Sequence, residues 1–281
     1  MRMTFRAAGC GVLAAAMALW AAPARAQNPD EMMPDQSAAK AQEILKQVIA
    51  ALGGQAYLDV RSSDCTGRLA QFGHSGDLNG YAKFHDYWLF PDKNRTEYDK
   101  KGTIVELFNG NQGWTLDKGG VTDEPADAVH DFQEQVKTDM DNVLRFRLHE
   151  DGIAFRYGGA DLVDLKQADW IEIADREHRT FRMAVDQSTH LPARWVIVSR
   201  NPLTRERSED NTIYSEFLPI DGVQTPRKIA RWHDGRETFE AYYDTCKYNT
   251  GLSADLFSKA SLDQRYAQVG KKKDKDNKKK N

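Results

Sequence analysis

The chain has 281 residues, of which 29% are charged and 40% hydrophobic, and its formal net charge is −3 at pH 7. The middle of the chain has neither a long Pro/Gly/Ser linker nor a repeat of fixed period, so we expect one large domain and exclude a solenoid. An acidic body also excludes nucleic acid as the expected partner, because binding to phosphates needs a basic surface.

The first 26 residues have the organisation of a secretory signal peptide. Arg2 and Arg6 precede an apolar stretch at residues 12–22, and Ala24 and Ala26 occupy the small-residue positions of a cleavage site. This order predicts cleavage after Ala26, which removes three arginines and leaves a formal charge of −6. No later stretch approaches the ~20 apolar residues of a membrane span, so we expect a soluble periplasmic protein.

Two segments have the periodicity of helices that bury one face. Residues 37–52 place apolar side chains at helical spacing and stop at the Gly53-Gly54 pair. A second segment starts near Pro125 and carries an apolar face, with an interruption expected near residues 141–142. Both helices therefore need a partner surface.

Most of the remaining chain alternates apolar with other residues, as strands with one buried face do. Phe181, Met183 and Val185 are one such run, and turn signals such as Asp221-Gly222 separate the runs. Because the helices do not alternate with the strands, a doubly wound parallel sheet is excluded. The pattern predicts an α+β protein: a strongly curved antiparallel sheet, an unclosed half-barrel, whose concave face is covered by the helices.

The two cysteines beyond the signal peptide are Cys65 and Cys246. In an oxidising compartment they can form a disulfide that closes a long loop. The alternative is two separately buried thiols, and the sequence leaves both interpretations open.

The end of the chain is rich in lysine. Residues 270–281 hold seven lysines, two aspartates and no apolar residue. Such a composition buries too little surface to offset its ordering entropy, so we expect the domain to span residues 27–262 and a disordered tail to span residues 263–281. The local charge of +5 would attract an anionic membrane surface, and the alternative is a solubilising tail.

No motif for catalysis, metal binding or cofactor binding is present in the sequence. Ser75 has a glycine directly after it and lacks the G-x-S-x-G spacing of a nucleophile elbow. No two histidines have the spacing of ligands that share a metal ion. We therefore predict no enzyme, no metal and no cofactor.

The alternating faces instead carry many aromatic and aliphatic side chains. A curved sheet that its own helices cover only in part leaves apolar area that needs a ligand. The side chains that we expect to line such a cavity are Phe84, Trp88, Leu107, Trp114, Phe181, Met183, Val185, Trp195, Trp232 and Phe239.

Five local patterns occur in order along the chain. They are ALGG at 51–54, NGNQGW at 109–114, DQSTHLP at 186–192, FLPIDGVQTP at 217–226 and NTGLSADLF at 249–257. Together they resemble the periplasmic outer-membrane lipoprotein-sorting, or LolA-like, family. The resemblance implies an unclosed β-barrel with helices in its concave face and an apolar cavity that shields acyl chains in transit.

The classical carrier of that family uses an inward-facing arginine; no position here matches it, and Arg68 is a candidate by location only, so no such role is assigned. We predict a non-catalytic periplasmic carrier or sensor that binds a lipid, a lipoprotein acyl chain or another hydrophobic ligand inside the curved sheet. Release would require the helices to move, with hinges after Gly53-Gly54 and around Gly119-Gly120. The alternatives are an envelope interaction module that binds a partner peptide and, less favoured, an unrecognised hydrolase.

Overall fold

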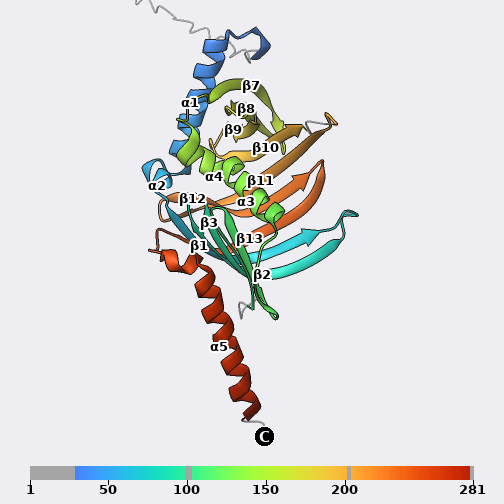
Figure 1. Cartoon of the computed structure of the whole chain (residues 1–281). Coiled ribbons are helices and arrows are strands. Elements are labelled where there is room, and N and C mark those ends of the chain that lie inside the picture. Colours follow the sequence, from blue (N-terminus) through green and yellow to red (C-terminus); the bar gives the residue numbers. More distant parts are fainter. Residues whose placement is uncertain (1–28, 99–102, 201–203, 279–281) are drawn as a thin grey trace, which may run out of the picture.

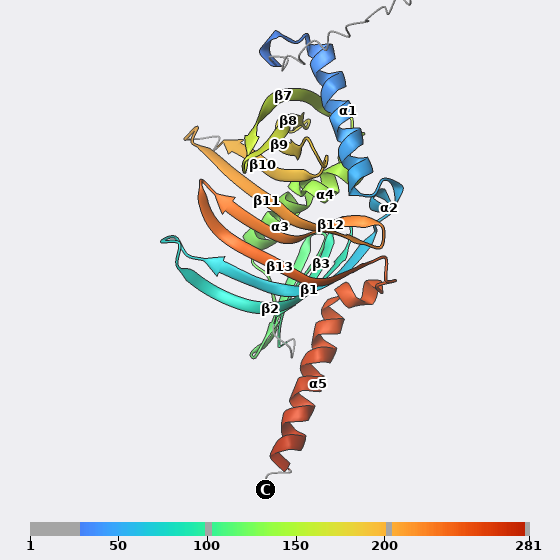
Figure 2. The same ribbon diagram turned by 180° about the vertical axis from the view of Figure 1, so that it is seen from behind.

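The computed structural model describes residues 29–98, 103–200 and 204–278. Its main element is one sheet of thirteen strands, in which every neighbouring pair is antiparallel. The sheet curves strongly and its two edge strands do not pair, so the barrel stays open (Figures 1 and 2). The predicted α+β class and unclosed antiparallel half-barrel are confirmed. The predicted signal peptide, residues 1–26, lies outside the described residues.

The strands follow one another in short hairpins for most of the chain. They are β1 (Ser62–Phe72), β2 (Leu78–Leu89), β3 (Lys93–Tyr98), β4 (Ile104–Asn109), β5 (Gln112–Asp117), β6 (Gly120–Asp123), β7 (Ala154–Val163), β8 (Lys166–Ala174), β9 (Thr180–Asp186), β10 (Pro192–Arg200), β11 (Arg207–Ile220), β12 (Val223–His233) and β13 (Arg236–Tyr248).

The helical elements among the described residues are fewer than the strands. They are η1 (Pro29–Glu31), α1 (Pro34–Leu52), α2 (Gln55–Leu58), α3 (Ala126–Thr138), α4 (Met140–Asn142), the π-helical turn η2 (Val143–Arg147), η3 (Ala254–Phe257) and α5 (Lys259–Lys278).

The strand order explains why helices cross the sheet. The order is β6-β5-β4-β3-β2-β1-β13-β12-β11-β10-β9-β8-β7, so β6 and β7 are the opposite edges. The segment that connects them contains α3, α4 and η2, and it must therefore span one whole face of the sheet. Figure 1 shows α3 and α4 in front of the strands and Figure 2 shows them behind, so they lie in the concave face.

The two predicted helices form at the expected places. The first extends over α1, and its apolar stripe, which includes Ala41, Leu45 and Val48, is buried. The second is interrupted after Thr138, where the Asp139 side chain accepts a hydrogen bond from the Asn142 amide and caps α4. An N-cap carboxylate satisfies an amide that the new helix leaves without a partner.

The main core lies under α1, α4 and η2 at the β7–β10 end of the sheet. There the stripe of α1 packs with Met140, Val143 and Leu144 against inward side chains of the strands, including Phe181 and Met183. All of these side chains are buried, so the helices fill this end of the concave face.

A second layer covers the other face at the opposite end of the sheet. Phe108 stacks on Phe132 of α3 with 4.6 Å between ring centroids, whereas its neighbour Leu107 packs with Leu262 of α5. Because adjacent residues of a strand point to opposite faces, α3 and α5 lie on opposite sides of the same strands.

The expectation of a disordered tail from residue 263 is wrong for the described residues, because α5 continues to Lys278. Leu262 is buried against β4 and β5, and the Arg265 guanidinium forms an ion pair with Glu97 at 2.8 Å. Glu97 also accepts from the buried Arg95 side chain, so the start of α5 is tied to β3. A composition argument overlooks such anchors, and lysine is itself a good helix former.

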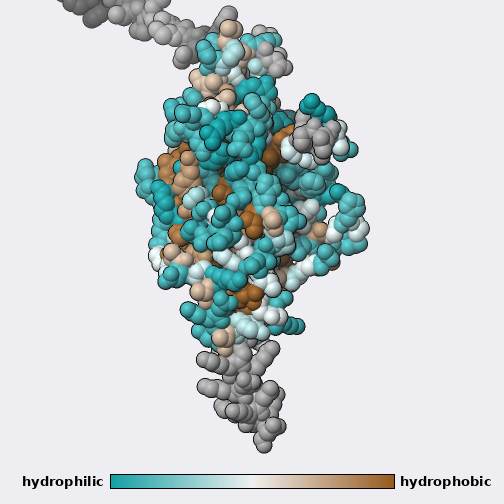
Figure 3. All heavy atoms as spheres, in the orientation of Figure 1, coloured by the Kyte–Doolittle hydropathy of each residue, from teal (hydrophilic) through white to brown (hydrophobic). Residues whose placement is uncertain are grey.

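The face seen in Figure 3 is mostly hydrophilic, and its apolar residues form separate patches. None of the helices in the described parts of the chain combines the length and apolar character needed to cross a membrane.

Candidate ligand cavity

A cavity of about 380 Å³ lies between the middle strands and the crossing helices. Its walls come from β1, β2 and β10–β13 on the sheet side, and from α2, α3, α4 and the following turn on the other side. The cavity remains open because side chains of the helices fill the concave face on both sides of it. The helices fill the β7–β10 end, and at the other end Phe132 of α3 stacks on Phe108 and Trp88.

The end of α3 is held over the cavity by a hydrogen bond from the sheet. The Trp195 indole Nε1 on β10 donates to the Thr138 carbonyl at 2.9 Å. A buried tryptophan usually finds an acceptor for this group, and here the acceptor is a carbonyl that the ending helix leaves free. Trp195 therefore positions the end of α3, which covers the cavity.

The lining is rich in aromatic side chains. They supply apolar surface and, in the tyrosines, hydroxyl groups at its edge. The nine aromatic residues are Tyr57, Trp88, Phe90, Trp195, Tyr214, Phe217, Trp232, Tyr243 and Tyr248.

Arg145 and Asp141 form a paired charge in one wall. The Arg145 guanidinium lies 3.4 Å from Asp141, and its side chain is only 2% exposed. It also lies over the rings of Tyr57 and Phe90, with its central carbon 4.4 and 4.9 Å from the centroids. The Tyr57 hydroxyl donates to Asp141 at 2.7 Å, so this cation is enclosed by two rings and a carboxylate.

Asp139 and Asp86 also line the cavity, but neither forms an ion pair with a described residue. Burial, with the nearby Asp141 charge, raises the pKa of Asp139 to about 6. Burial also raises the pKa of Asp86, although hydrogen bonds from Asn94 and Thr96, both at 2.8 Å, favour its charged form. The cavity therefore holds two carboxylates in a poorly solvated setting.

Three of the ten side chains expected to line the cavity do so: Trp88, Trp195 and Trp232. Two others, Leu107 and Trp114, lie on the opposite face of the sheet under α5. The expectation is wrong for these two because alternation shows which residues share a face and not which face turns inward.

The other five expected residues lie in packed clusters. Phe181, Met183 and Val185 belong to the main core beneath the helices, so their face is the predicted one but the space above it is filled. Phe84 and Phe239 pack in a smaller cluster around Leu69 and Ala241 further along the strands. Periodicity cannot show where a helix rests on the sheet, so these five are also corrections.

Sequence reasoning missed the charged residues of the lining. One signal was available, because Asp86 lies between Phe84 and Trp88 at the same strand period and must share their inward face. Another was the four-residue spacing of Asp141 and Arg145 in a helical segment. Arg68, by contrast, lies on the outer face and forms an ion pair with Asp244 at 3.1 Å.

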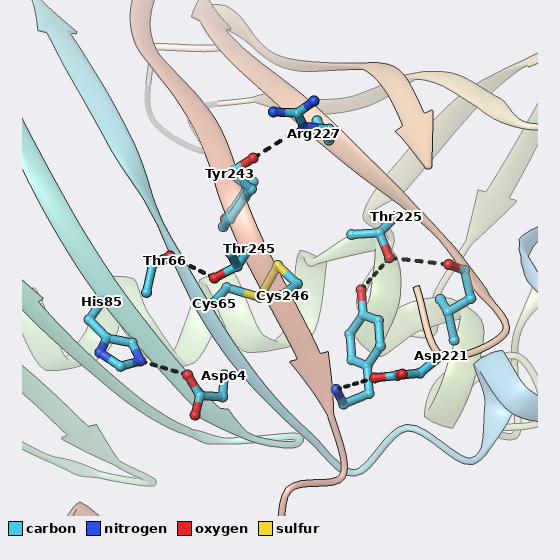
Figure 4. Close-up of a disulfide and its surroundings, with 12 residues drawn as sticks. Asp64, Cys65, Thr66, His85, Asp221, Thr225, Arg227, Tyr243, Thr245 and Cys246 are labelled. Carbon is cyan, nitrogen blue, oxygen red and sulfur yellow. Dashed lines mark hydrogen bonds and ion pairs between the residues drawn. A yellow bond between two sulfur atoms is a disulfide. The ribbon is translucent and has the colours of Figure 1, made fainter. Parts of the chain in front are cut away.

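A disulfide borders the cavity. Cys65 on β1 and Cys246 on β13 are opposite each other in the strand register, with 4.1 Å between their Cα atoms, and their sulfur atoms are bonded (Figure 4). Of the two interpretations left open by the sequence, the structure has the bridge. It lies at the one place in the sheet where neighbouring strands are far apart in the chain.

The remaining polar candidates form no catalytic or metal arrangement within the described residues. The Ser75 hydroxyl is exposed and donates to Asp77 two residues away, as in an ordinary turn. No group of three or more His, Cys, Asp or Glu side chains among the described residues is arranged to hold a metal ion.

Neither a family model nor a curated protein matches the sequence, whereas solved structures match the fold. A DUF1329 family protein from Desulfovibrio piger aligns with a TM-score of 0.55 and 14% identity, covering 79% of this chain and 98% of that one. A candidate outer membrane lipoprotein-sorting protein domain from Vibrio parahaemolyticus aligns with a TM-score of 0.53 and 13% identity, covering 80% and 99%. At such identities the likeness shows the fold alone, and this chain has the lipoprotein-sorting, or LolA-like, fold.

Proposed function

We propose that the protein is a non-catalytic carrier or sensor of the cell envelope that holds one hydrophobic or amphipathic ligand in the cavity. The observation that carries this proposal is the space of about 380 Å³ left between the concave face and the helices. Ligand pockets commonly measure about 300–1,000 Å³, so this one suits a small molecule or a single chain.

The lining can supply the binding energy without a specific contact to the chain of the ligand. Each buried CH₂ contributes ~0.8 kcal/mol, so an eight-carbon chain gains roughly 6 kcal/mol before the costs of binding. The aromatic side chains of the lining provide the surface for this burial. Transport then consists of shielding the ligand from water and releasing it when the helices move.

The fold and the sequence both support a role in the envelope. Lipoprotein sorting is the description of the Vibrio domain, and the two proteins share the fold. The predicted signal peptide favours the periplasm. We extend the proposal to a lipid, an acyl chain or a lipoprotein as the partner, and to the lysine-rich end of α5 as a contact with anionic membranes. Figure 1 shows α5 projecting away from the sheet.

The carrier proposal is tested by blocking the cavity. Ile229 lines it from β12, whereas the adjacent Lys228 faces the other side of the same strand. We expect protein purified from a bacterial periplasm to retain lipid in native mass spectrometry, Ile229→Trp to lose it, and Lys228→Trp to keep it. Absence of any lipid from all three proteins contradicts the proposal, and a bound polypeptide supports the interaction module instead.

A further inference from the structure

The lining of the cavity carries more acidic than basic side chains. Four carboxylates line it, those of Asp86, Asp139, Asp141 and Asp210, against two guanidiniums. Asp141 is paired with Arg145, and Asp210 with His233 at 2.7 Å. Two carboxylates then remain without a paired cation among the described residues, and one guanidinium faces them.

That guanidinium belongs to Arg231. It lies over the Phe239 ring, with its central carbon 5.3 Å from the centroid, and the side chain is exposed. Its charge lowers the pKa of Asp86 and of Asp139, but only as a lesser effect that burial outweighs. The positive charge of Arg231 therefore compensates the two carboxylates only in part.

Aromatic rings surround the same two carboxylates. Burial raises the pKa of Tyr214, and the Asp139 charge adds to it; burial also raises the pKa of Tyr243, to which Asp86 contributes. Tyr214 and Tyr243 line the same cavity as Asp139 and Asp86. The negative face of an aromatic ring attracts a cation, so rings and carboxylates in one cavity favour the same kind of ligand.

The protein already shows how this lining holds a cation, because Arg145 lies between two rings and beside Asp141 in the adjoining wall. Four polar atoms of the lining, moreover, are buried without a hydrogen-bond partner among the described residues: Asn211 Oδ1, Trp232 Nε1, and Nε and Nη1 of Arg145, whose charge is already paired with Asp141. The amide oxygen is an acceptor for an N–H group, and the indole is a donor for an oxygen. Native structures rarely leave such atoms unpaired when the protein is in its working state.

We propose that the ligand of this cavity is an amphiphile with a cationic amine, whose charge is accepted by Asp139 and Asp86 and enclosed by the tyrosine and tryptophan rings. This inference rests on the proposed carrier function and names the chemical class of its ligand. An anionic amphiphile would bring its charge to two unpaired carboxylates, and of the two guanidiniums in the lining that of Arg145 is already paired with Asp141.

Three probes with the same eight-carbon chain test the inference: octylammonium, octyl glucoside and octyl sulfate, each below its micelle concentration. Binding to the protein without residues 1–26 is followed by calorimetry and by tryptophan fluorescence, since three tryptophans line the cavity. We expect octylammonium to bind at least about tenfold more tightly than octyl glucoside, and octyl sulfate to bind least.

The matched variants are Asp139→Asn and Asp151→Asn, the latter on an exposed turn outside the cavity. We expect Asp139→Asn to weaken the binding of octylammonium about tenfold and to leave the binding of octyl glucoside unchanged. Unchanged binding of octyl glucoside also shows that the cavity is intact. Asp151→Asn should alter the affinity for neither probe. Equal affinity for the three probes, or an unaltered response to octylammonium in Asp139→Asn, overturns the headgroup assignment and keeps the carrier. If none of the probes binds, the carrier function itself fails.

Discussion

Asp139 both caps α4 and faces the cavity, and its carboxyl has a pKa raised from the ordinary 3.8 to about 6 by burial and by Asp141. A raised carboxyl pKa means that the native state holds the proton more tightly than the unfolded chain does. The charged group therefore destabilises the fold fully above about pH 6, and this effect declines as the pH falls toward 4. We expect Asp139→Asn, which retains a capping side chain, to raise the free energy of unfolding at pH 7.5 by ~1–2 kcal/mol.

Urea unfolding at pH 7.5 and pH 4.5 measures this residue effect. The gain of Asp139→Asn should shrink at the lower pH, where the native carboxyl is already protonated. The exposed Asp151→Asn serves as the reference. Identical stabilities of Asp139→Asn and the parent at both pH values would show that the carboxyl is well solvated. A residue that lowers stability in the free protein is commonly one that its site needs for binding.

At the scale of elements, α5 combines an anchored start with a charged end. Leu262 and Arg265 attach the start to β3–β5, and seven lysines lie within residues 270–281. Each lysine near an anionic surface contributes about 1 kcal/mol, and salt screens this attraction. We expect full-length protein to sediment with phosphatidylglycerol vesicles at low salt, and protein that lacks residues 270–281 to remain in solution.

The deletion starts beyond the anchors, so the unfolding midpoint of the shortened protein should stay that of the parent. Neutral phosphatidylcholine vesicles are the second control, and neither protein should sediment with them. Equal sedimentation of full-length and shortened protein with anionic vesicles would leave the lysines with a solubilising role.

At the scale of the whole molecule, the sheet consists of two arms that meet at β1 and β13. The arms are β1–β6 and β7–β13, and the Cys65–Cys246 disulfide joins them across 181 residues of sequence (Figure 4). A bridge across so long a loop stabilises by up to about 5 kcal/mol, because it restricts the unfolded chain. We expect the double substitution Cys65→Ala and Cys246→Ala to lower the free energy of unfolding by about 2–5 kcal/mol, measured by guanidinium unfolding.

Reduction should lower the free energy of unfolding of the parent protein by about as much as the double substitution does. Reduction should leave the free energy of unfolding of the double variant unchanged. Both should still fold, because the β1–β13 ladder extends well beyond the cysteine pair. If reduction does not change the unfolding midpoint of the parent protein, the pairing of β1 with β13 stabilises this junction without help from the disulfide.

The sequence determined the local elements because their causes are local. Strand alternation, the turn at Asp221-Gly222 and the helical stripe of residues 37–52 depend on neighbours within a few positions, and all three have the predicted form in the structure. From these elements, the antiparallel half-barrel follows, because helices that do not alternate with strands leave few ways of covering a curved sheet. Of the aromatic residues that the sequence analysis expected in a cavity, Trp88, Trp195 and Trp232 lie in its lining.

Tertiary structure alone decided which face of each strand turns inward and where the helices stop filling the sheet. Leu107 and Trp88 both lie in strands with alternating apolar residues. Trp88 lines the cavity, whereas Leu107 packs beneath α5 because that helix covers the outer face. Asp139 lines the cavity only because the segment between β6 and β7 must cross from one edge of the sheet to the other. Contacts of this kind join residues that are distant in the chain, and no local pattern carries their geometry.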